Sequence, residues 1–113
     1  MATPLRDDKL FGSPRRTEVL VLIALLEETY PGELVRLLDA SKASILYIVD
    51  GLVAEGVLAS RPLGRTRRLS LDPRYFAAPE LRALLLRLGA GDRGLQALAA
   101  RRRSRPRRKG KPL

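Results

Sequence analysis

The chain has 113 residues, of which 45% are hydrophobic and only five are aromatic, so its core is expected to be aliphatic. It carries 22 basic and 12 acidic residues, a formal net charge of +10, and has no cysteine and no histidine. These absences exclude disulfides, zinc fingers, iron–sulfur ligation, thiol nucleophiles and imidazole bases. Only carboxylates could bind a metal, and we expect no metal and no cofactor.

The positive charge is unevenly distributed along the chain. Residues 100–113 contain eight basic and no acidic residues, whereas residues 1–99 contain 14 basic and 12 acidic residues. A segment so charged and so poor in apolar residues predicts a disordered tail over 101–113. The tail either adds affinity for nucleic acid that is independent of sequence or serves only solubility. Its basic residues are Arg101, Arg102, Arg103, Arg105, Arg107, Arg108, Lys109 and Lys111.

The rest of the chain suffices for one compact domain of about 85 to 95 residues, near the small end for independent folding. Dimerisation would help such a domain. No run of about 20 apolar residues occurs, and charged residues interrupt the N-terminus where a signal peptide would be apolar. We expect a soluble, cytoplasmic, nucleoid-associated protein that has no membrane partner. Residues 1–12 are expected to be a loose lead-in.

A first helix is predicted over residues 14–28. Ser13 is a good N-cap, and Pro14 suits the first helical position because its missing N–H has no partner there. The interior of this helix is apolar on nearly all sides, which indicates a central core element. Arg15 and Arg16 in its first turn are either solvated or face a phosphate.

A helix-turn-helix is predicted next. Residues 29–32 break the first helix and can supply a short extended segment, and a brief second helix follows over 33–38. Ser41 then caps a third helix over 42–55, which Gly56 ends. A helix, a tight turn and a capped helix form a helix-turn-helix.

The third helix is predicted to have two faces. One is a buried stripe at a spacing of three and four residues, formed by Ile45, Ile48, Val49, Leu52 and Val53. The opposite face is expected to carry Lys42, Ala43, Leu46, Tyr47 and Asp50.

A basic β-hairpin is predicted after the third helix. Its strands cover residues 57–62 and 66–71, the turn lies at 63–65, and Pro62 indicates an edge strand. Four arginines fall within eight residues without an acid between them, namely Arg61, Arg65, Arg67 and Arg68. Positive charges this close together repel one another, which favours binding to an anionic partner. The alternative is a solvated hairpin that happens to be basic.

A fourth helix is predicted over residues 79–88, with Pro79 and Glu80 at its start and Gly89 and Gly91 as its stop. Residues 89–100 form a linker or a short helix. The leucines of the fourth helix form one apolar stripe, which serves either the core or a dimer. These leucines are Leu81, Leu84, Leu85 and Leu88.

Together these elements predict an α+β, mainly α domain over residues 13–88, with a three-helix core, a hairpin and an additional C-terminal helix. The residues that carry a resemblance are Phe11-Gly12-Ser13, Tyr30, Ser41, Glu55-Gly56-Val57-Leu58 and Leu71-Asp72-Pro73. Their pattern resembles the winged helix-turn-helix domains of ArsR/MarR-type bacterial transcriptional regulators over roughly residues 10–88.

This resemblance implies DNA binding as a dimer, with the third helix in the major groove and the hairpin, or wing, against flanking phosphates or the minor groove. The implied contacts of the helix are Lys42, Ala43, Ser44, Leu46, Tyr47 and Asp50. The implied contacts of the wing are Arg61, Arg65, Thr66, Arg67 and Arg68. Leu46 and Tyr47 either contact a thymine methyl group and a phosphate or pack within the domain or dimer.

We therefore expect a homodimeric, sequence-specific regulator that binds double-stranded DNA. An enzyme is disfavoured because the adjacent acid pairs, Asp7-Asp8 and Glu27-Glu28, lack a partner group for acid–base chemistry. The competing hypothesis is a winged-helix adaptor whose third helix binds a protein partner while the tail binds nucleic acid. A preferred duplex sequence would favour the regulator, whereas equal binding to any nucleic acid, lost with residues 101–113, would favour the adaptor.

Overall fold

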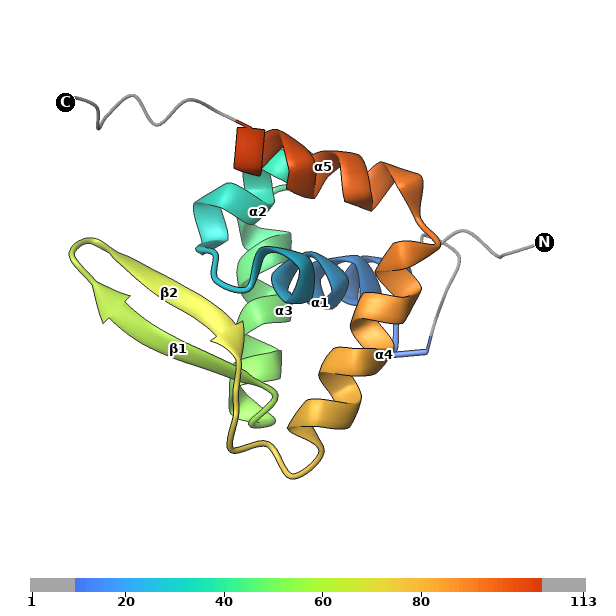
Figure 1. The fold of residues 1–113 in the computed structure, drawn as a ribbon. Helices are drawn as coiled ribbons and strands as arrows, with labels where there is room; N and C mark the ends of the chain where they lie inside the picture. Colours follow the sequence, from blue (N-terminus) through green and yellow to red (C-terminus); the bar gives the residue numbers. More distant parts are fainter. Residues whose placement is uncertain (1–9, 105–113) are drawn as a thin grey trace, which may run out of the picture.

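The structure is a computed structural model that describes residues 10–104 of the chain. In this part it is mainly helical, with five helices and one two-stranded antiparallel sheet (Figure 1), which confirms the predicted α+β, mainly α class. In chain order the elements are α1 (Pro14–Leu26), α2 (Pro31–Leu38), α3 (Lys42–Ala54), β1 (Leu58–Leu63), β2 (Thr66–Leu71), α4 (Ala78–Ala90) and α5 (Arg93–Ser104).

Helix α1 is the centre of the core, as its apolar sequence predicts. Every residue from Val19 to Ala24 is buried, and the helix contacts α4, α5 and β2. Figure 1 shows α1 running through the middle of the molecule, with α4 and α5 beside it and α3 on the hairpin side. Burial on all sides explains why this helix lacks a polar face.

The predicted starts of α1 and α3 are confirmed, with their serine caps. The Ser13 hydroxyl accepts the Arg16 backbone N–H at 3.1 Å, and the Ser41 hydroxyl accepts the Ser44 backbone N–H at 3.1 Å. Several boundaries differ from the prediction, among them two that flank the first interhelical segment. Helix α1 ends at Leu26 rather than at residue 28, and α2 begins at Pro31 rather than at residue 33. Proline again occupies a first helical position, where its missing N–H costs nothing.

The hairpin pairs β1 with β2 along their full lengths. Its turn consists of two residues, Gly64 and Arg65, rather than the predicted three, and Gly64 has a φ of +62°, which glycine adopts readily. The expected extended segment is confirmed, because Thr29 and Leu69 exchange backbone hydrogen bonds of 3.0 and 2.8 Å. Strand β2 therefore lies between Thr29 and β1, which leaves Pro62 on an edge strand as predicted.

Gly89 does not stop α4, so that prediction was wrong. The helix continues to Ala90 with Gly91 at its C-cap, and Gly89 is a buried residue inside it. A Cβ atom on Gly89 would lie 2.9 Å from Val21 Cγ1 of α1. The glycine is therefore a close-packing residue that lets two helices approach.

The C-terminal prediction also needs correction. Of the two alternatives for residues 89–100, the short helix is confirmed, because α5 begins at Arg93; the helix continues to Ser104, so residues 101–104 are helical rather than disordered. The Asp92 carboxylate accepts the Leu95 backbone N–H at 3.0 Å, and Leu95 and Ala99 are buried in the core. Residues 105–113 of the predicted tail lie outside the described residues, as do residues 1–9 of the lead-in.

The leucine stripe of α4 is divided between the core and the surface. Leu85 is fully buried, Leu81 and Leu88 are half-buried, and Leu84 is 39% exposed. The core interpretation therefore holds for Leu85 and in part for its neighbours. None of the helices described is both long and apolar enough to cross a membrane.

Candidate nucleic-acid interface

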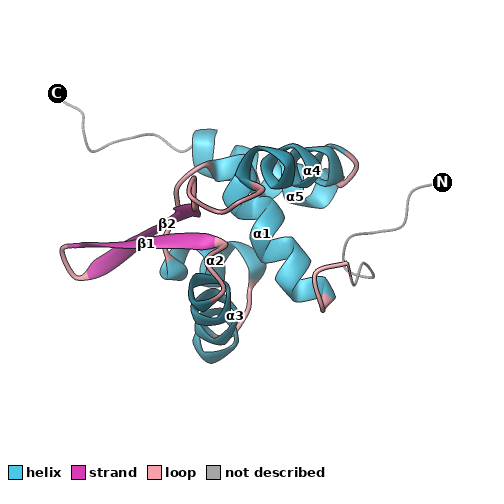
Figure 2. Cartoon of the chain, turned by 90° about the horizontal axis from the view of Figure 1, so that it is seen from below, coloured by secondary structure: helices cyan, strands magenta, loops and turns pink. Residues whose placement is uncertain are grey.

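Helix α3 presents the exposed face that its sequence predicts. Its buried stripe is confirmed, since Ile45, Ile48, Val49 and Leu52 are buried and Val53 is half-buried. Figure 2 shows α3 at one edge of the molecule, beside the hairpin and away from α4 and α5. Leu46 is half-buried, whereas the side chain of Tyr47 is 84% exposed. The remaining exposed members of this face are Lys42, Ala43, Ser44 and Asp50.

The hairpin divides its four arginines between two faces and the tip. Residues alternate along a strand, so Arg67 lies on the same face as the buried Leu69. Arg61 and Arg68 are cross-strand partners on the opposite face. Arg65 is exposed in the turn at the tip.

One ion pair joins the hairpin to α3. The Arg67 Nη2 atom lies 2.6 Å from Asp50 Oδ1, although Asp50 is 17 residues earlier in the chain. The Asp50 side chain is 62% exposed, so this pair contributes at most about 1 kcal/mol to stability. Its importance is geometric, because it holds Arg67 beside the exposed face of α3.

A second carboxylate, that of Glu28, forms ion pairs with two more of the hairpin arginines. Glu28 Oε2 lies 3.3 Å from Arg61 Nη2, and Glu28 Oε1 lies 3.9 Å from Arg68 Nε. No acid lies between these arginines in the sequence, but distant parts of the chain supply carboxylates to Arg61, Arg67 and Arg68. Arg65 makes no ion pair or hydrogen bond with the residues that the structure describes.

The interface retains an excess of positive charge despite these pairs. Lys42 and the four hairpin arginines carry five positive charges and their partners Asp50 and Glu28 carry two negative charges, which leaves a net charge of three. The exposed threonine at the hairpin tip, Thr66, adds a neutral hydroxyl beside Arg65. We call the following set the α3–hairpin surface: Lys42, Ala43, Ser44, Leu46, Tyr47, Asp50, Arg61, Arg65, Thr66, Arg67 and Arg68.

The first-turn arginines of α1 both have carboxylate partners. Arg15 Nη1 lies 3.1 Å from Glu18 Oε1, and Arg16 Nη2 lies 2.7 Å from Glu55 Oε1. The sequence analysis considered solvated charges or a phosphate contact, and these intramolecular ion pairs are a third arrangement. The Arg16 pair links α1 to the end of α3.

The predicted tail residues do not share one environment. Arg101 is exposed on α5, Arg102 is half-buried against the body of the domain, and Arg103 belongs to the same helix. The other five basic residues lie outside the described part. Sequence reasoning missed Glu28 as a partner of the hairpin and nominated Arg102 only as a tail residue, because their contacts join segments 33 to 76 residues apart and leave no local pattern.

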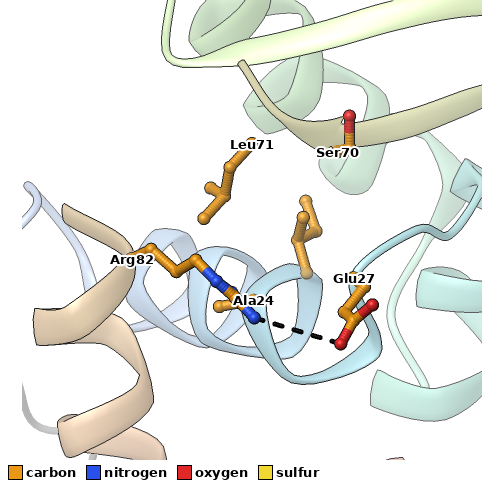
Figure 3. Close-up of a pocket in the computed structure, with 6 residues that line it drawn as sticks. Ala24, Glu27, Ser70, Leu71 and Arg82 are labelled. Atoms are coloured by element: carbon orange, nitrogen blue, oxygen red, sulfur yellow. Dashed lines mark ion pairs between the residues drawn. The ribbon is translucent and has the colours of Figure 1, made fainter. Parts of the chain in front are cut away.

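A small cavity lies between α1, β2 and α4 and has a volume of about 210 Å³ (Figure 3). Ile23, Ala24 and Leu71 line it with apolar groups, and Arg82 Nη2 lies 3.9 Å from Glu27 Oε2 at its side. Ser70 is the remaining lining residue. Across residues 10–104, no group of three or more carboxylates could hold a metal ion.

Comparisons of the chain with models of protein families, with curated proteins and with solved structures found no match. A functional proposal for this chain therefore rests on the geometry and the charge described above.

Proposed function

We propose that the chain is a winged helix-turn-helix protein that binds double-stranded DNA and regulates transcription at the nucleoid. Helix α3 enters the major groove, and the hairpin is the wing that contacts the flanking backbone or minor groove. The observation that carries this proposal is the contact of 2.6 Å between Asp50 on α3 and Arg67 on the hairpin. It keeps an exposed helix face and an arginine-rich hairpin side by side, and a major groove about 12 Å wide admits such a helix between two phosphate backbones.

The exposed groups of α3 suit a mixed mode of recognition. Lys42 at the first helical position can bind a phosphate, and the Tyr47 hydroxyl can donate to a phosphate or a base edge. Ala43 and Leu46 offer apolar contacts that suit thymine methyl groups. Asp50 would repel a phosphate, but Arg67 partly neutralises it. Sequence preference then depends on apolar contacts and DNA shape more than on forked hydrogen bonds.

A homodimer extends the same mechanism. Two copies related by a two-fold axis would place two α3 helices in successive major grooves, about 34 Å apart along the duplex. Two exposed large apolar residues outside the α3–hairpin surface, Phe76 at 90% and Leu84 at 39%, lie near or on α4. We propose that this part of the molecule contributes to the dimer contact.

Selection of bound sequences from a random duplex library tests the proposal. A regulator enriches a defined motif, and replacing Arg65, Arg67 and Arg68 by Ala weakens binding to that motif. Failure of the purified protein to bind any duplex at low salt would refute the proposal, as would unchanged binding by the triple variant.

The adaptor is the second candidate, and the exposure of Tyr47 favours it. A tyrosine that is 84% exposed beside Leu46 could anchor a protein partner as well as DNA. An adaptor enriches no duplex sequence and binds all nucleic acids equally through its C-terminal segment. A deletion that tests this must begin at residue 105, because residues 101–104 are part of α5.

A further inference from the structure

Glu28 lies where the chain leaving α1 meets the hairpin. The next residue, Thr29, exchanges backbone hydrogen bonds of 3.0 and 2.8 Å with Leu69 of β2. Glu28 Oε2 lies 3.3 Å from Arg61 Nη2 on β1, and Glu28 Oε1 lies 3.9 Å from Arg68 Nε on β2. One carboxylate therefore pairs with an arginine of each strand.

Contacts from α5 hold the backbone of Glu28 in place. Arg102 Nη2 donates to the Glu28 backbone oxygen at 2.9 Å and to that of Leu26 at 3.2 Å. Backbone oxygens at the C-terminus of a helix lack partners within it and favour such a cation. The same guanidinium is held by Glu33, which is 3% exposed and whose Oε2 atom lies 3.7 Å from Arg102 Nε. The position of Glu28 beside the hairpin is therefore set by contacts that its own side chain does not make.

The two arginines that Glu28 contacts form a site that suits a phosphate. Arg61 and Arg68 are direct cross-strand partners, and like charges at such positions repel one another. The side chains of Glu28, Arg61 and Arg68 are 51%, 63% and 34% exposed, so a solvent anion can reach them. Exposed ion pairs are weak and are screened by salt. A phosphate accepts hydrogen bonds from a guanidinium as a carboxylate does, so it can take the place of the Glu28 side chain.

We propose that Glu28 limits the affinity of the chain for DNA by competing with the phosphate backbone for Arg61 and Arg68. The inference rests on the proposed DNA binding and adds a residue of the chain that opposes it. In the free protein the carboxylate occupies the arginine pair, and in the complex a phosphate displaces it. The carboxylate cancels one of the two positive charges of the pair. The wild type therefore makes the equivalent of one phosphate contact fewer than the two arginines could provide.

Binding of the full-length Glu28→Gln variant to the duplex selected above, across a series of salt concentrations, tests the competition. One restored phosphate contact makes the slope of log affinity against log salt steeper by about 0.9 and raises affinity by up to about eightfold at 0.1 M salt. Glu27→Gln is the matched control, because it removes the same charge one residue earlier. The Glu27 carboxylate lies 3.9 Å from the Arg82 guanidinium of α4 (Figure 3), so this variant is expected to keep the wild-type slope. An unchanged slope for Glu28→Gln, or equal gains for both variants, overturns the inference.

The same substitution in a second background tests whether Glu28 acts through the two arginines. When Arg61 and Arg68 are both replaced by Ala, Glu28→Gln is expected to give no gain in affinity, because the groups for which it competes are absent. An undiminished gain in that background would show general charge repulsion and would contradict the competition. Absence of duplex binding by the wild-type chain at low salt would refute the proposed function itself. Wild-type binding that Glu28→Gln leaves unchanged refutes this inference alone.

Discussion

Replacing Gly89 by alanine tests the close approach of α4 to α1. The added Cβ would lie 2.9 Å from Val21 Cγ1 and 3.4 Å from both terminal methyl groups of Leu25. Carbon atoms prefer separations of about 3.5 to 4.0 Å, and a buried β-branched valine in a helix has little freedom to rotate. Overpacking of this kind costs about 1 to 3 kcal/mol, and the higher helix propensity of alanine returns about 1 kcal/mol. The net expectation is a loss of about 1 kcal/mol.

A second glycine in a helix interior provides the matched control. At Gly51 in α3 the nearest contact of an added Cβ is Arg16 Nη1 at 3.6 Å, an ordinary van der Waals distance. Gly51→Ala is therefore expected to stabilise the protein by about 0.5 to 1 kcal/mol. Urea unfolding followed by circular dichroism, at one protein concentration, measures both variants. Equal stabilisation by Gly89→Ala and Gly51→Ala would refute the close contact.

Three further predictions follow from single contacts. Asp50→Asn removes a negative charge from α3 while its amide oxygen can still accept from Arg67 and keep the hairpin beside the helix. Duplex affinity should therefore rise by up to about eightfold at 0.1 M salt, the equivalent of one phosphate contact, and unchanged affinity would count against this expectation. Ser41→Ala removes a cap that accepts a backbone N–H at 3.1 Å and should cost about 1 kcal/mol in thermal unfolding. Hydrogen bonds from the backbone N–H of Arg74, and then from its guanidinium, lower the pKa of Asp72. The ionised Asp72 carboxylate therefore stabilises the fold fully above the unfolded pKa of about 4, and this contribution is lost as the pH falls through the lowered folded pKa. Urea titrations across acidic pH should show this loss in the wild type and not in Asp72→Asn.

Signals confined to a few residues made part of the fold predictable. Ser13 and Ser41 each precede an apolar helix and bond a backbone N–H three residues on, so the helix starts could be read from neighbouring residues. The buried stripe of α3 follows from helical periodicity alone. The two strands followed in the same way from the turn between them, where Gly64 adopts a positive φ.

The unpredictable features depend on tertiary contacts. Gly89 has the sequence context of a helix stop, and only the nearness of Val21 makes it a packing residue. Arg102 belongs to a run of arginines that composition assigns to a tail, yet the carbonyls of α1 and the buried Glu33 hold it in a helix. The ion pair of Arg67 likewise involves a carboxylate on another element, Asp50 of α3. The sequence therefore predicted the basic hairpin but could not predict which carboxylates pair with it.

The salt dependence of duplex binding, compared between the wild type and Arg65→Ala, tests the proposed interface most directly. Arg65 lies at the hairpin tip and makes no contact that the described structure would lose. Each phosphate contact contributes a slope of about −0.9 in log affinity against log salt. The slope for Arg65→Ala should therefore be less steep than that of the wild type by about 0.9, and its duplex affinity at 0.1 M salt should be lower by about eightfold. Arg87→Ala, an equal charge change on the exposed side of α4, should keep the wild-type slope. A flat response of the wild type, or equal slopes for the wild type and Arg65→Ala, would contradict DNA binding through the α3–hairpin surface.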